Sequence, residues 1–363
     1  MKNILFTIPN FKTAGSGREM FNIVEHLDSR KFTAIICVNT PGGKLFDEIQ
    51  SKGYEIIVRR HQFGLNATGF LNLIRSISFF RKLKIDVWQS FDWSSDFTQA
   101  LLARLSGTKF VYVKKNMNSD RKAWFIKFRL CSHIIARNTT MVETFLTKYL
   151  HKTTRIPGGV DLNRFTYQEG SSKTTSTVFR KNPNKKVIVC MAQISRVKGQ
   201  HLIVQACQGL DNVEIWLPGA VRDEGYKAEI SKLAADLEMK EHVIFWGSVS
   251  EVTTMLKEAD VFVLPTTYFD NHQEGCPVAL MEALSSGLIC IASDVAGNKD
   301  LILDGKTGYL FEAENPSSLK SKLELAFANN NIPKMRSAAL SSILADHTLP
   351  YESKQFAAVY ESL

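Results

Sequence analysis

The feature that most constrains the fold is the regular alternation of short apolar runs with longer segments of helical periodicity. In the first part of the chain the apolar runs are "NILFTI", "AIICV", "IDVWQS" and "KFVYVKK", and the helical segments include "GREMFNIVEHL" and "TGFLNLIRSISFFRKLK". A second series begins after residue 184 with "KKVIVCMA", "VEIWLPG", "HVIFWG", "VFVLPT" and "LICIAS". This order is typical of β-α-β units around a parallel sheet covered on both faces. It predicts an α/β protein with two separate doubly wound parallel sheets.

The length of 363 residues also favours two domains, because a single core usually stops growing before that size. The polar, Ser/Thr-rich stretch "YQEGSSKTTSTVFRKNPN" is typical of a linker. We therefore expect a first domain at residues 1–166, a linker at 167–184 and a second domain at 185–345. The tail at 346–363 carries a Pro and then an amphipathic helical pattern.

The composition is that of a soluble globular protein, with 44% hydrophobic and 22% charged residues. No apolar run approaches the roughly 20 residues needed to span a bilayer, and the first nine residues do not resemble a signal peptide. These features predict a cytoplasmic location.

The six cysteines show no C-x-x-C spacing, so we expect them to be small buried residues without disulfides, in a reducing compartment.

The charge is distributed unevenly. Residues 1–165 hold 26 Lys and Arg against 12 Asp and Glu, whereas the remainder holds 19 against 24. A basic first half indicates an anionic partner, such as a membrane surface or a phosphorylated acceptor, or else a solvated face without a partner. Nucleic acid is disfavoured because no recognisable binding module is present. The basic, apolar segments "FLNLIRSISFFRKLK" and "DRKAWFIKFRL" suit peripheral contact with an anionic membrane, but also ordinary helices packed on a sheet.

Ligands of open parallel sheets bind at the carboxyl ends of the strands, so we expect the active site in a cleft between the two domains. The loop after the first strand places Ser16 and Gly17 ahead of a helix, which suits close approach to a phosphate or sugar. The segment "AQISRVKGQH" carries Arg196 and Lys198 beside a glycine, and cations there suit a diphosphate. An exposed basic turn is the alternative. Neither a G-x-G-x-x-G nor a P-loop motif occurs.

Two glutamates flank a predicted helix start in "QEGCPVALMEALSSG". Pro277 suits the first helical position, so the helix should begin near Cys276 with backbone N–H groups able to receive phosphate. Glu274 lies in the preceding loop, where it can reach a ligand. Glu282 lies inside the mostly apolar helix, and a buried carboxylate is costly unless it is paired. Sugar hydroxyls or a structural ion pair would both satisfy it.

These residues resemble a known family. The two glutamates with "ALSSGLICIASDVAGNKDLILDGKTGYLF" after them, together with "IPGGVDLNRF" and "SRVKGQ", look like the retaining glycosyltransferases of family 4, which have the GT-B fold. The resemblance covers nearly the whole chain. It implies transfer of a sugar from a UDP- or GDP-linked donor to a saccharide or lipid-linked acceptor, in surface polysaccharide or lipopolysaccharide biosynthesis. It also implies that the tail helix returns to the first domain.

The resemblance assigns roles position by position. Glu274 would contact the donor sugar, and Lys198 with Arg196 would hold the diphosphate, so these three are the catalytic candidates. The implied donor-binding residues are Glu282 on the ribose, Gly275, Cys276, Pro277 and Gln193 near the phosphates, Gly247 and Val249 near the base, and Ser16 and Gly17 from the first domain. The candidates on the acceptor side are Asp92, Lys114, Lys115 and Asn116.

Several positions depart from the family pattern. The family usually has Gly-Arg where this chain has Ala192-Gln193, and it commonly has histidines where "KKNMN" and Gln89-Ser90 stand here. No Asp-x-Asp pair occurs, so neither a metal nor another cofactor is expected, and the cations and the helix dipole should stabilise the leaving diphosphate. The resemblance implies retention of configuration with attack on the face that the diphosphate leaves.

Two alternatives remain beside the transferase. An epimerase of the same fold would act on the nucleotide-sugar without an acceptor. A non-catalytic partner subunit would bind the nucleotide-sugar but lack acceptor chemistry, which Gln193 and Lys115 suggest.

Overall fold

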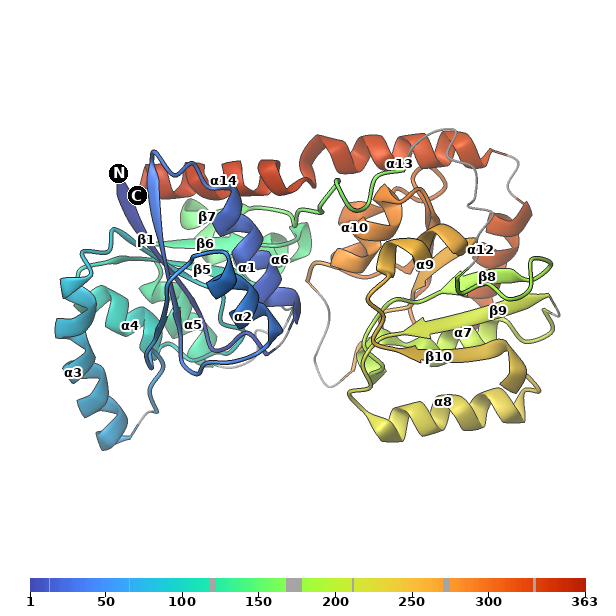
Figure 1. Cartoon of the computed structure of the whole chain (residues 1–363), viewed down its shortest axis with the longest axis horizontal. Coiled ribbons are helices and arrows are strands. Elements are labelled where there is room, and N and C mark those ends of the chain that lie inside the picture. Colours follow the sequence, from blue (N-terminus) through green and yellow to red (C-terminus); the bar gives the residue numbers. More distant parts are fainter. Residues whose placement is uncertain are drawn as a thin grey trace. The chain divides into compact units, whose positions relative to one another are not determined.

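A computed structural model describes residues 1–12, 14–64, 66–115, 117, 122–167, 178–210, 212–269, 275–328 and 331–363. The chain divides into two compact units. Unit 1 comprises Met1–Gly159 and Leu349–Leu363, and unit 2 comprises Val160–Thr348. Each unit contains one fully parallel sheet with helices on both faces (Figure 1).

Unit 1 contains a seven-stranded sheet with the order β3-β2-β1-β4-β5-β6-β7. Its elements in chain order are β1 (Lys2–Ile8), α1 (Ala14–His26), β2 (Phe32–Val38), α2 (Lys44–Ser51), β3 (Ile56–Val58), α3 (Ala67–Lys82), β4 (Val87–Ser90), α4 (Thr98–Leu105), β5 (Lys109–Lys114), α5 (Lys122–Leu130), β6 (His133–Ala136), α6 (Thr139–Thr144), the 3₁₀ helix η1 (Thr147–Lys152), β7 (Thr153–Arg155) and, from the end of the chain, α14 (Leu349–Ser362).

The two faces of this sheet follow from the period of two along each strand. In β1, Ile4 and Phe6 point into a core that includes residues of α1, α2 and α14, whereas Leu5 points into a second core with residues of α3, α4 and α5. Both cores are apolar because each face is covered by helices. This explains why the strands appear in the sequence as almost continuous apolar runs.

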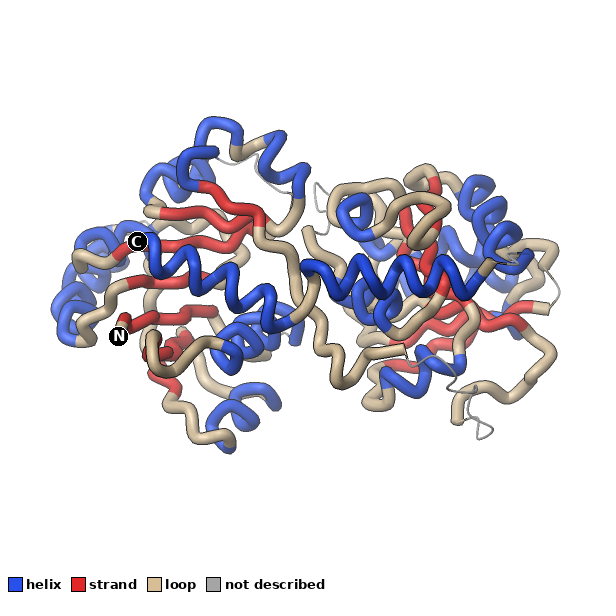
Figure 2. The backbone as a smooth tube through the Cα atoms, turned by 90° about the horizontal axis from the view of Figure 1, so that it is seen from above, coloured by secondary structure: helices blue, strands red, loops and turns tan. Residues whose placement is uncertain are grey.

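The last helix, α14, belongs to unit 1 although it is more than 180 residues away in sequence. It runs along the strands of the unit 1 sheet (Figure 2). Phe356 and Tyr360 are fully buried there, and the Tyr360 hydroxyl lies 3.1 Å from the Gln89 Oε1 atom. Gln89, one of the departures from the family pattern, is therefore a buried structural residue that contacts the last helix.

Unit 2 contains a six-stranded parallel sheet with the order β10-β9-β8-β11-β12-β13. Its elements are β8 (Lys186–Val189), the 3₁₀ helix η2 (Arg196–Lys198), α7 (Gln200–Ala206), β9 (Val213–Pro218), α8 (Glu224–Asp236), the 3₁₀ helix η3 (Lys240–His242), β10 (Val243–Gly247), α9 (Val252–Glu258), β11 (Val261–Leu264), α10 (Val278–Ser285), β12 (Ile289–Ser293), α11 (Asn298–Leu301), β13 (Tyr309–Phe311), α12 (Pro316–Ala328) and α13 (Ile332–Asp346).

The boundary between the units lies earlier than the expected one at residue 166. Val160 and Phe165 are buried in a core of unit 2, and the Val160 N–H donates to the His347 carbonyl at 2.9 Å. The end of the expected linker also packs on unit 2, because the backbone N–H groups of residues 178–180 donate to the Glu258 carboxylate. The remainder of that linker, residues 168–177, lies outside the described residues.

The predicted fold class is confirmed, since both series of apolar runs form parallel, doubly wound sheets. Five of the six cysteines are buried as expected, and Cys276 is half-buried. No helix in the described part of the chain is both long and apolar enough to cross a membrane.

Candidate functional site

The topology of unit 2 marks one place for a ligand. Strand β8 has β9 on one side and β11 on the other, so the strand order reverses between β8 and β11. Helices leave opposite faces of the sheet at such a point, and the crevice at the carboxyl ends of the strands binds ligands in open α/β sheets. The loops after β8 and β11 are therefore the core of the candidate site. The corresponding point in unit 1 lies between β1 and β4.

These two loops of unit 2 are fastened to each other. The Thr267 hydroxyl donates to the Arg196 carbonyl at 2.8 Å, and its backbone N–H donates to the Val197 carbonyl at 2.9 Å. Gly199 has φ +63°, and a Cβ atom there would lie 2.0 Å from the Pro265 carbonyl oxygen. Only glycine fits both this backbone conformation and this spacing. The loops 195–199 and 265–267 thus form one continuous surface, called here the floor of the site, and hydrogen bonds to main-chain carbonyls hold them together.

Arg196, a predicted diphosphate ligand, turns toward α8 in the structure. Its guanidinium forms an ion pair with Glu229, and its Nε atom lies 3.8 Å from Asp223 Oδ2. The hydrogen bond that Arg196 donates to Glu229 raises the pKa of Arg196 above its ordinary value. Lys198 ends η2 directly before Gly199 and is half-buried. Lys198 is therefore on the floor of the site, whereas Arg196 would have to leave its partners to reach a diphosphate.

The loops after β8, β9 and β10 also meet at this edge. The Gln193 carbonyl accepts a hydrogen bond from Gln200 Nε2 at 2.9 Å, and the Gln193 side chain is exposed. A Cβ atom on Gly219 would lie 1.9 Å from the Ala192 carbonyl oxygen, and the Gly219 N–H donates to the Gly247 carbonyl at 2.7 Å. The structure thus places the predicted residues Gln193 and Gly247 on one edge.

Val249, also predicted near the base, packs as a partly buried residue against the core that contains α9 and α10.

The start of α10 differs from the prediction. The sequence suggested a start near Cys276 with Pro277 at the first helical position, but the helix begins at Val278 and Pro277 is its N-cap. The physical reason is that Pro277 has a non-helical ψ of 88° while its carbonyl already accepts the Leu280 N–H at 3.0 Å. Gly275 is buried in the turn just before this cap.

Glu282 lies in the middle of α10. Burial raises the pKa of its carboxyl to about 7, and the positive charge of Arg164 acts in the opposite direction. Within the described ranges, no hydrogen bond or ion pair engages this carboxylate. A carboxyl group in such surroundings can accept hydrogen bonds from a bound hydroxyl, and shifted pKa values are common at functional sites. Arg164 was missed as a site residue, although it lies in the quoted "IPGGVDLNRF" motif.

Two predicted site residues, Glu274 and Asn116, lie outside the residues that the structure describes.

In unit 1, the sequence predicted Ser16 and Gly17 ahead of a helix, but α1 begins at Ala14 and both residues lie within its first turn. A Cβ atom on Gly17 would lie 2.9 Å from the ring of Phe11 and 3.0 Å from a methyl group of Leu45. Packing against these two side chains therefore favours glycine at this position, because a larger residue would push them aside. Ser16 is half-buried beside it.

Asp92, a predicted acceptor-side residue, forms an ion pair in the interior. Its Oδ2 atom lies 2.9 Å from Lys127 Nζ, and both side chains are buried. Asp92 also accepts hydrogen bonds from the backbone and hydroxyl of Ser94. The structure therefore gives Asp92 a structural role in fixing the loop after β4.

The two lysines at the end of β5 are also enclosed. Lys114 is fully buried, and its Nζ atom lies 3.8 Å from the centre of the Trp124 ring. Lys115 Nζ lies 4.4 Å from the Phe91 ring centre and 3.6 Å from Glu19 Oε2. Burial lowers the pKa of Lys115 to about 8, although Glu19 raises it. Lys115 can therefore lose its proton near neutral pH.

Sequence reasoning missed a buried charge cluster in unit 1. Arg137 pairs with both Glu19 and Glu352, and the other Glu352 oxygen accepts the Gly159 N–H at 3.0 Å. Burial raises the pKa of Glu352, while Arg137 lowers it. No local pattern connects these residues. The only signal was a glutamate on the apolar face of the tail helix.

No group of three or more His, Cys, Asp or Glu side chains among the described residues could hold a metal ion.

Comparison with known families identifies both units. The profile described as "Glycosyltransferase Family 4" matches residues 13–164, and the profile described as "Glycosyl transferases group 1" matches residues 171–339. Together they cover most of the chain.

Relatives and solved structures agree with this. The chain is 28% identical over 169 residues to the Salmonella typhimurium protein WcaL, named for colanic acid biosynthesis, covering 46% of this chain and 39% of WcaL. It is 25% identical over 199 residues to an Escherichia coli UDP-Gal:α-D-GlcNAc-diphosphoundecaprenol α-1,3-galactosyltransferase, covering 53% and 49%. The matches thus span less than half the length of these relatives.

The Anabaena protein HepE, crystallised with UDP and glucose, superposes with a TM-score of 0.84 at 17% identity over all of both chains. With both family profiles matched in order and the two-sheet fold of these enzymes present, the chain belongs to the group 1 glycosyltransferases of family 4, which have the GT-B fold.

Proposed function

We propose that this protein transfers a sugar from a nucleotide-sugar to a saccharide or lipid-linked acceptor in surface polysaccharide or lipopolysaccharide assembly. Unit 2 binds the donor at the carboxyl ends of its strands. Support comes from the family, from WcaL and the galactosyltransferase as relatives, and from HepE, whose crystal contains UDP and glucose.

The observation that carries this proposal is the state of Glu282. Its half-buried carboxyl group, whose pKa burial raises to about 7, lies on α10, the helix between β11 and β12, without a hydrogen-bonding partner among the residues that are described. Burying such a group costs free energy unless something satisfies it. The two hydroxyls of a ribose supply donors of the required kind, and their binding would offset that cost.

The diphosphate lies nearest to Lys198 in this proposal. The hydrogen bonds between the loops after β8 and β11 fix the backbone that carries Lys198. The turn at 275–277 leads into the N-terminus of α10, which is the positive end of the helix dipole. Glu274 would contact the donor sugar, as its place before this turn suggests. Loss of Lys198 should therefore weaken donor binding, and Arg196 could contribute only after leaving its ion pair with Glu229.

We propose further that the reaction retains anomeric configuration and needs no divalent metal. Lysine and the helix dipole would stabilise the departing diphosphate, a task that preorganised positive charge performs without reorganisation. The acceptor hydroxyl would attack on the face that the diphosphate leaves. Turnover that disappears in EDTA and returns with one added metal would contradict metal independence, and an inverted anomeric centre in the NMR spectrum of the product would contradict retention.

Peripheral contact with an anionic membrane is part of the proposal. On α3, Phe70, Leu71 and Ile74 are 55%, 53% and 45% exposed, and Arg75, Arg81 and Lys82 lie on the same helix. On α5, Phe125 and Ile126 are 47% and 44% exposed. Apolar side chains among cations suit a helix on an anionic interface. Sedimentation with phosphatidylglycerol vesicles should weaken with salt and after Arg81→Glu. Insensitivity to both would contradict it.

A non-catalytic, donor-binding subunit is the second candidate. The observation in its favour is that Asp92 and Lys114 are buried in structural contacts and so offer no acceptor chemistry.

One experiment tests donor binding and separates the candidates. The intact protein is heated with UDP, GDP, ADP and their sugars, because a ligand that binds only the folded form raises the melting temperature. The donor that gives the largest shift is then incubated with extracts of surface glycolipid, and release of the free nucleotide is measured. A shift with turnover supports the transferase, a shift without turnover supports the subunit, and no shift contradicts both.

A further inference from the structure

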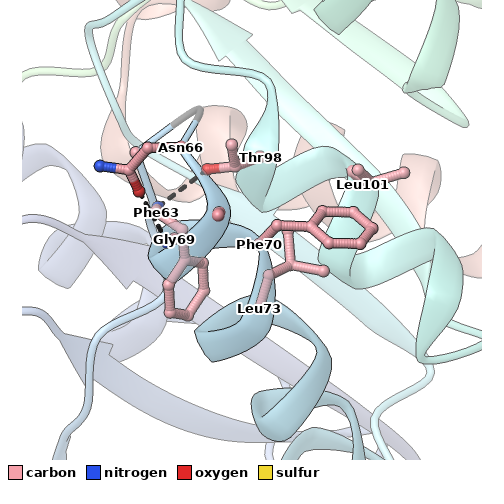
Figure 3. A pocket seen from close by; sticks show the side chains of 9 residues that line it. Phe63, Asn66, Gly69, Phe70, Leu73, Thr98 and Leu101 are labelled. Atoms are coloured by element: carbon pink, nitrogen blue, oxygen red, sulfur yellow. Dashed lines mark hydrogen bonds between the residues drawn. The ribbon is translucent and has the colours of Figure 1, made fainter.

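Unit 1 contains two adjoining pockets of opposite character. The first has a volume of about 390 Å³ and is lined mainly by apolar side chains, among them Phe63, Ala67, Phe70, Leu73 and Leu101. Figure 3 shows these side chains around the space between α3 and α4. The second has a volume of about 540 Å³ and is lined by polar side chains that include Arg60, Gln62 and Asp96. The two share Phe63 and Gly64, so they are neighbours.

The wall between the pockets is held by specific hydrogen bonds. Asn66 caps α3 by accepting the Gly69 N–H at 2.7 Å, and the Phe63 N–H donates to the Thr98 hydroxyl at 3.0 Å (Figure 3). A Cβ atom on Gly69 would lie 1.9 Å from the Gly64 carbonyl oxygen, so this approach of loop and helix requires glycine. The apolar pocket is therefore formed by the fold before any ligand arrives.

The polar pocket lies where ligands of parallel sheets bind. Its side chains come from the loops that follow β2, β3 and β4, at the carboxyl edge of the unit 1 sheet. Arg60 is exposed, and among the described residues it donates through its Nε atom alone, to the Gln62 carbonyl at 2.8 Å, so its terminal nitrogens can reach a ligand. Asp96 adds a carboxylate, half-buried, that accepts from Thr98 through Oδ1. A guanidinium and a carboxylate side by side suit the hydroxyl groups of a sugar.

The apolar pocket opens onto the outer face of its helix. Phe70 lines the pocket and is also 55% exposed, and Leu71 and Ile74 continue the apolar surface along α3. An apolar chain longer than the pocket could therefore leave it over this face.

We propose that the two pockets form the acceptor site for an amphipathic glycolipid, with its sugar in the polar pocket and the first part of its hydrocarbon chain in the apolar pocket. This inference rests on the proposed transferase function and specifies its acceptor class. The apolar lining selects a hydrocarbon chain, because it offers few partners for hydroxyls, and the adjoining charged side chains select a sugar at one end of that chain.

The test uses two probes with one head group, n-octyl and methyl β-D-glucopyranoside, titrated calorimetrically into the intact protein below the micelle threshold. Each buried methylene should strengthen binding about four-fold, so the octyl compound should bind at least about 10-fold tighter than the methyl compound. Equal affinities, or no binding of the octyl compound, would overturn the inference.

Three variants locate the binding. Ala67→Trp should fill the apolar pocket and Phe70→Ser should remove part of its wall, and each should reduce the octyl affinity at least about 10-fold. Leu150→Ser is the matched control, because Leu150 is exposed on η1 of the same unit and lines neither pocket, and it should retain the affinity. An unchanged affinity in Ala67→Trp, or an equal loss in Leu150→Ser, would show binding elsewhere and overturn the inference.

The melting-temperature shift with the nucleotide-sugar serves as an independent readout in all proteins. If the wild-type protein shows no such shift, the transferase proposal fails. If the shift is present in Ala67→Trp and the octyl affinity is unchanged, only the acceptor pocket is refuted.

Discussion

Arg137 and Glu352 form a buried ion pair between residues 215 positions apart in the sequence, with side chains only 2% and 1% exposed. Arg137 follows β6, and Glu352 lies on α14, so the pair fastens the last helix to the sheet of unit 1. The second Glu352 oxygen accepts the Gly159 N–H at the point where the chain leaves unit 1. The Glu352 carboxylate thus connects the start of α14, where the chain re-enters unit 1, to Gly159, where the chain leaves it.

Glu352→Ala should destabilise unit 1 by about 3–5 kcal/mol, because it removes a buried carboxylate partner of Arg137 and leaves Glu19 as the remaining one among the described residues. Urea unfolding followed by circular dichroism measures the change. The double variant Arg137→Met, Glu352→Leu should recover much of the loss, because it removes both buried charges. The exposed pair Lys31–Glu361 is the control, and Lys31→Ala should leave the unfolding curve unchanged. A Glu352→Ala protein as stable as the wild type would contradict this role.

His61 should make the protein less stable in acid. Burial lowers the pKa of His61 to about 4 from its ordinary value of 6.5. Its Nδ1 atom donates to the Arg59 carbonyl at 3.2 Å, and its Nε2 atom is buried without a partner, so a second proton has no acceptor. The unfolded chain therefore binds a proton that the folded chain does not. Between pH 6.5 and 4, stability should fall by a total of about 3 kcal/mol from this residue.

His61→Asn is the variant that isolates this effect, since the asparagine amide can still donate to the Arg59 carbonyl but does not titrate. Urea unfolding at pH 7 and pH 4.5 should show a smaller loss of stability in His61→Asn than in the wild type. Parallel losses in the two proteins would assign the acid sensitivity to carboxylates instead.

The fold could be predicted from sequence because its signals are local and repeated. The apolar runs and helical segments on both sides of residue 184 appear in the structure as strands and helices in the expected order. The start of α10 was placed one or two residues early, because a proline suits both the N-cap and the first helical position, and only the ψ angle of Pro277 in the structure separates the two.

The site was predictable only in part. Lys198 and Glu282 lie where a motif predicts them, on a loop and a helix beside the switch point. The burial and pairing of Asp92, Lys114 and Lys115 were not predictable, because each contacts a residue from another element of the fold. Their partners are, in the same order, Lys127, Trp124 and Glu19. The two pockets of unit 1 are likewise made by loops and helices that only the tertiary structure brings together.

Gly199→Ala should damage the floor of the donor site. Alanine would adopt φ +63° at a cost of about 1–2 kcal/mol, and its Cβ atom would also lie 2.0 Å from the Pro265 carbonyl oxygen. The two loops must then separate, so donor affinity should fall along with the melting temperature. Gly305→Ala is the control, because Gly305 has φ +74° but open space around its Cβ position. Equal effects of the two substitutions would contradict the role of the contact between the loops.

Glu282→Gln should weaken binding of the nucleotide-sugar about 10- to 100-fold, because a hydrogen bond to a charged group contributes about 1.5–3 kcal/mol. Calorimetric titration with the donor measures the change. Glu324→Gln on α12 is the matched control, since that side chain is exposed and belongs to none of the loops of the site.

The pH dependence separates a direct role of this carboxylate from a structural one. Burial raises the pKa of Glu282 to about 7, so in the protein without ligand the group is protonated below that pH and charged above it. If the charged form accepts hydrogen bonds from the ribose, donor affinity should increase from pH 6 to pH 8 and level off above it, and this step should be absent in Glu282→Gln. A structural glutamate would give parallel pH profiles in the two proteins. An identical step in the variant would therefore show that another group titrates and that Glu282 does not hold the donor.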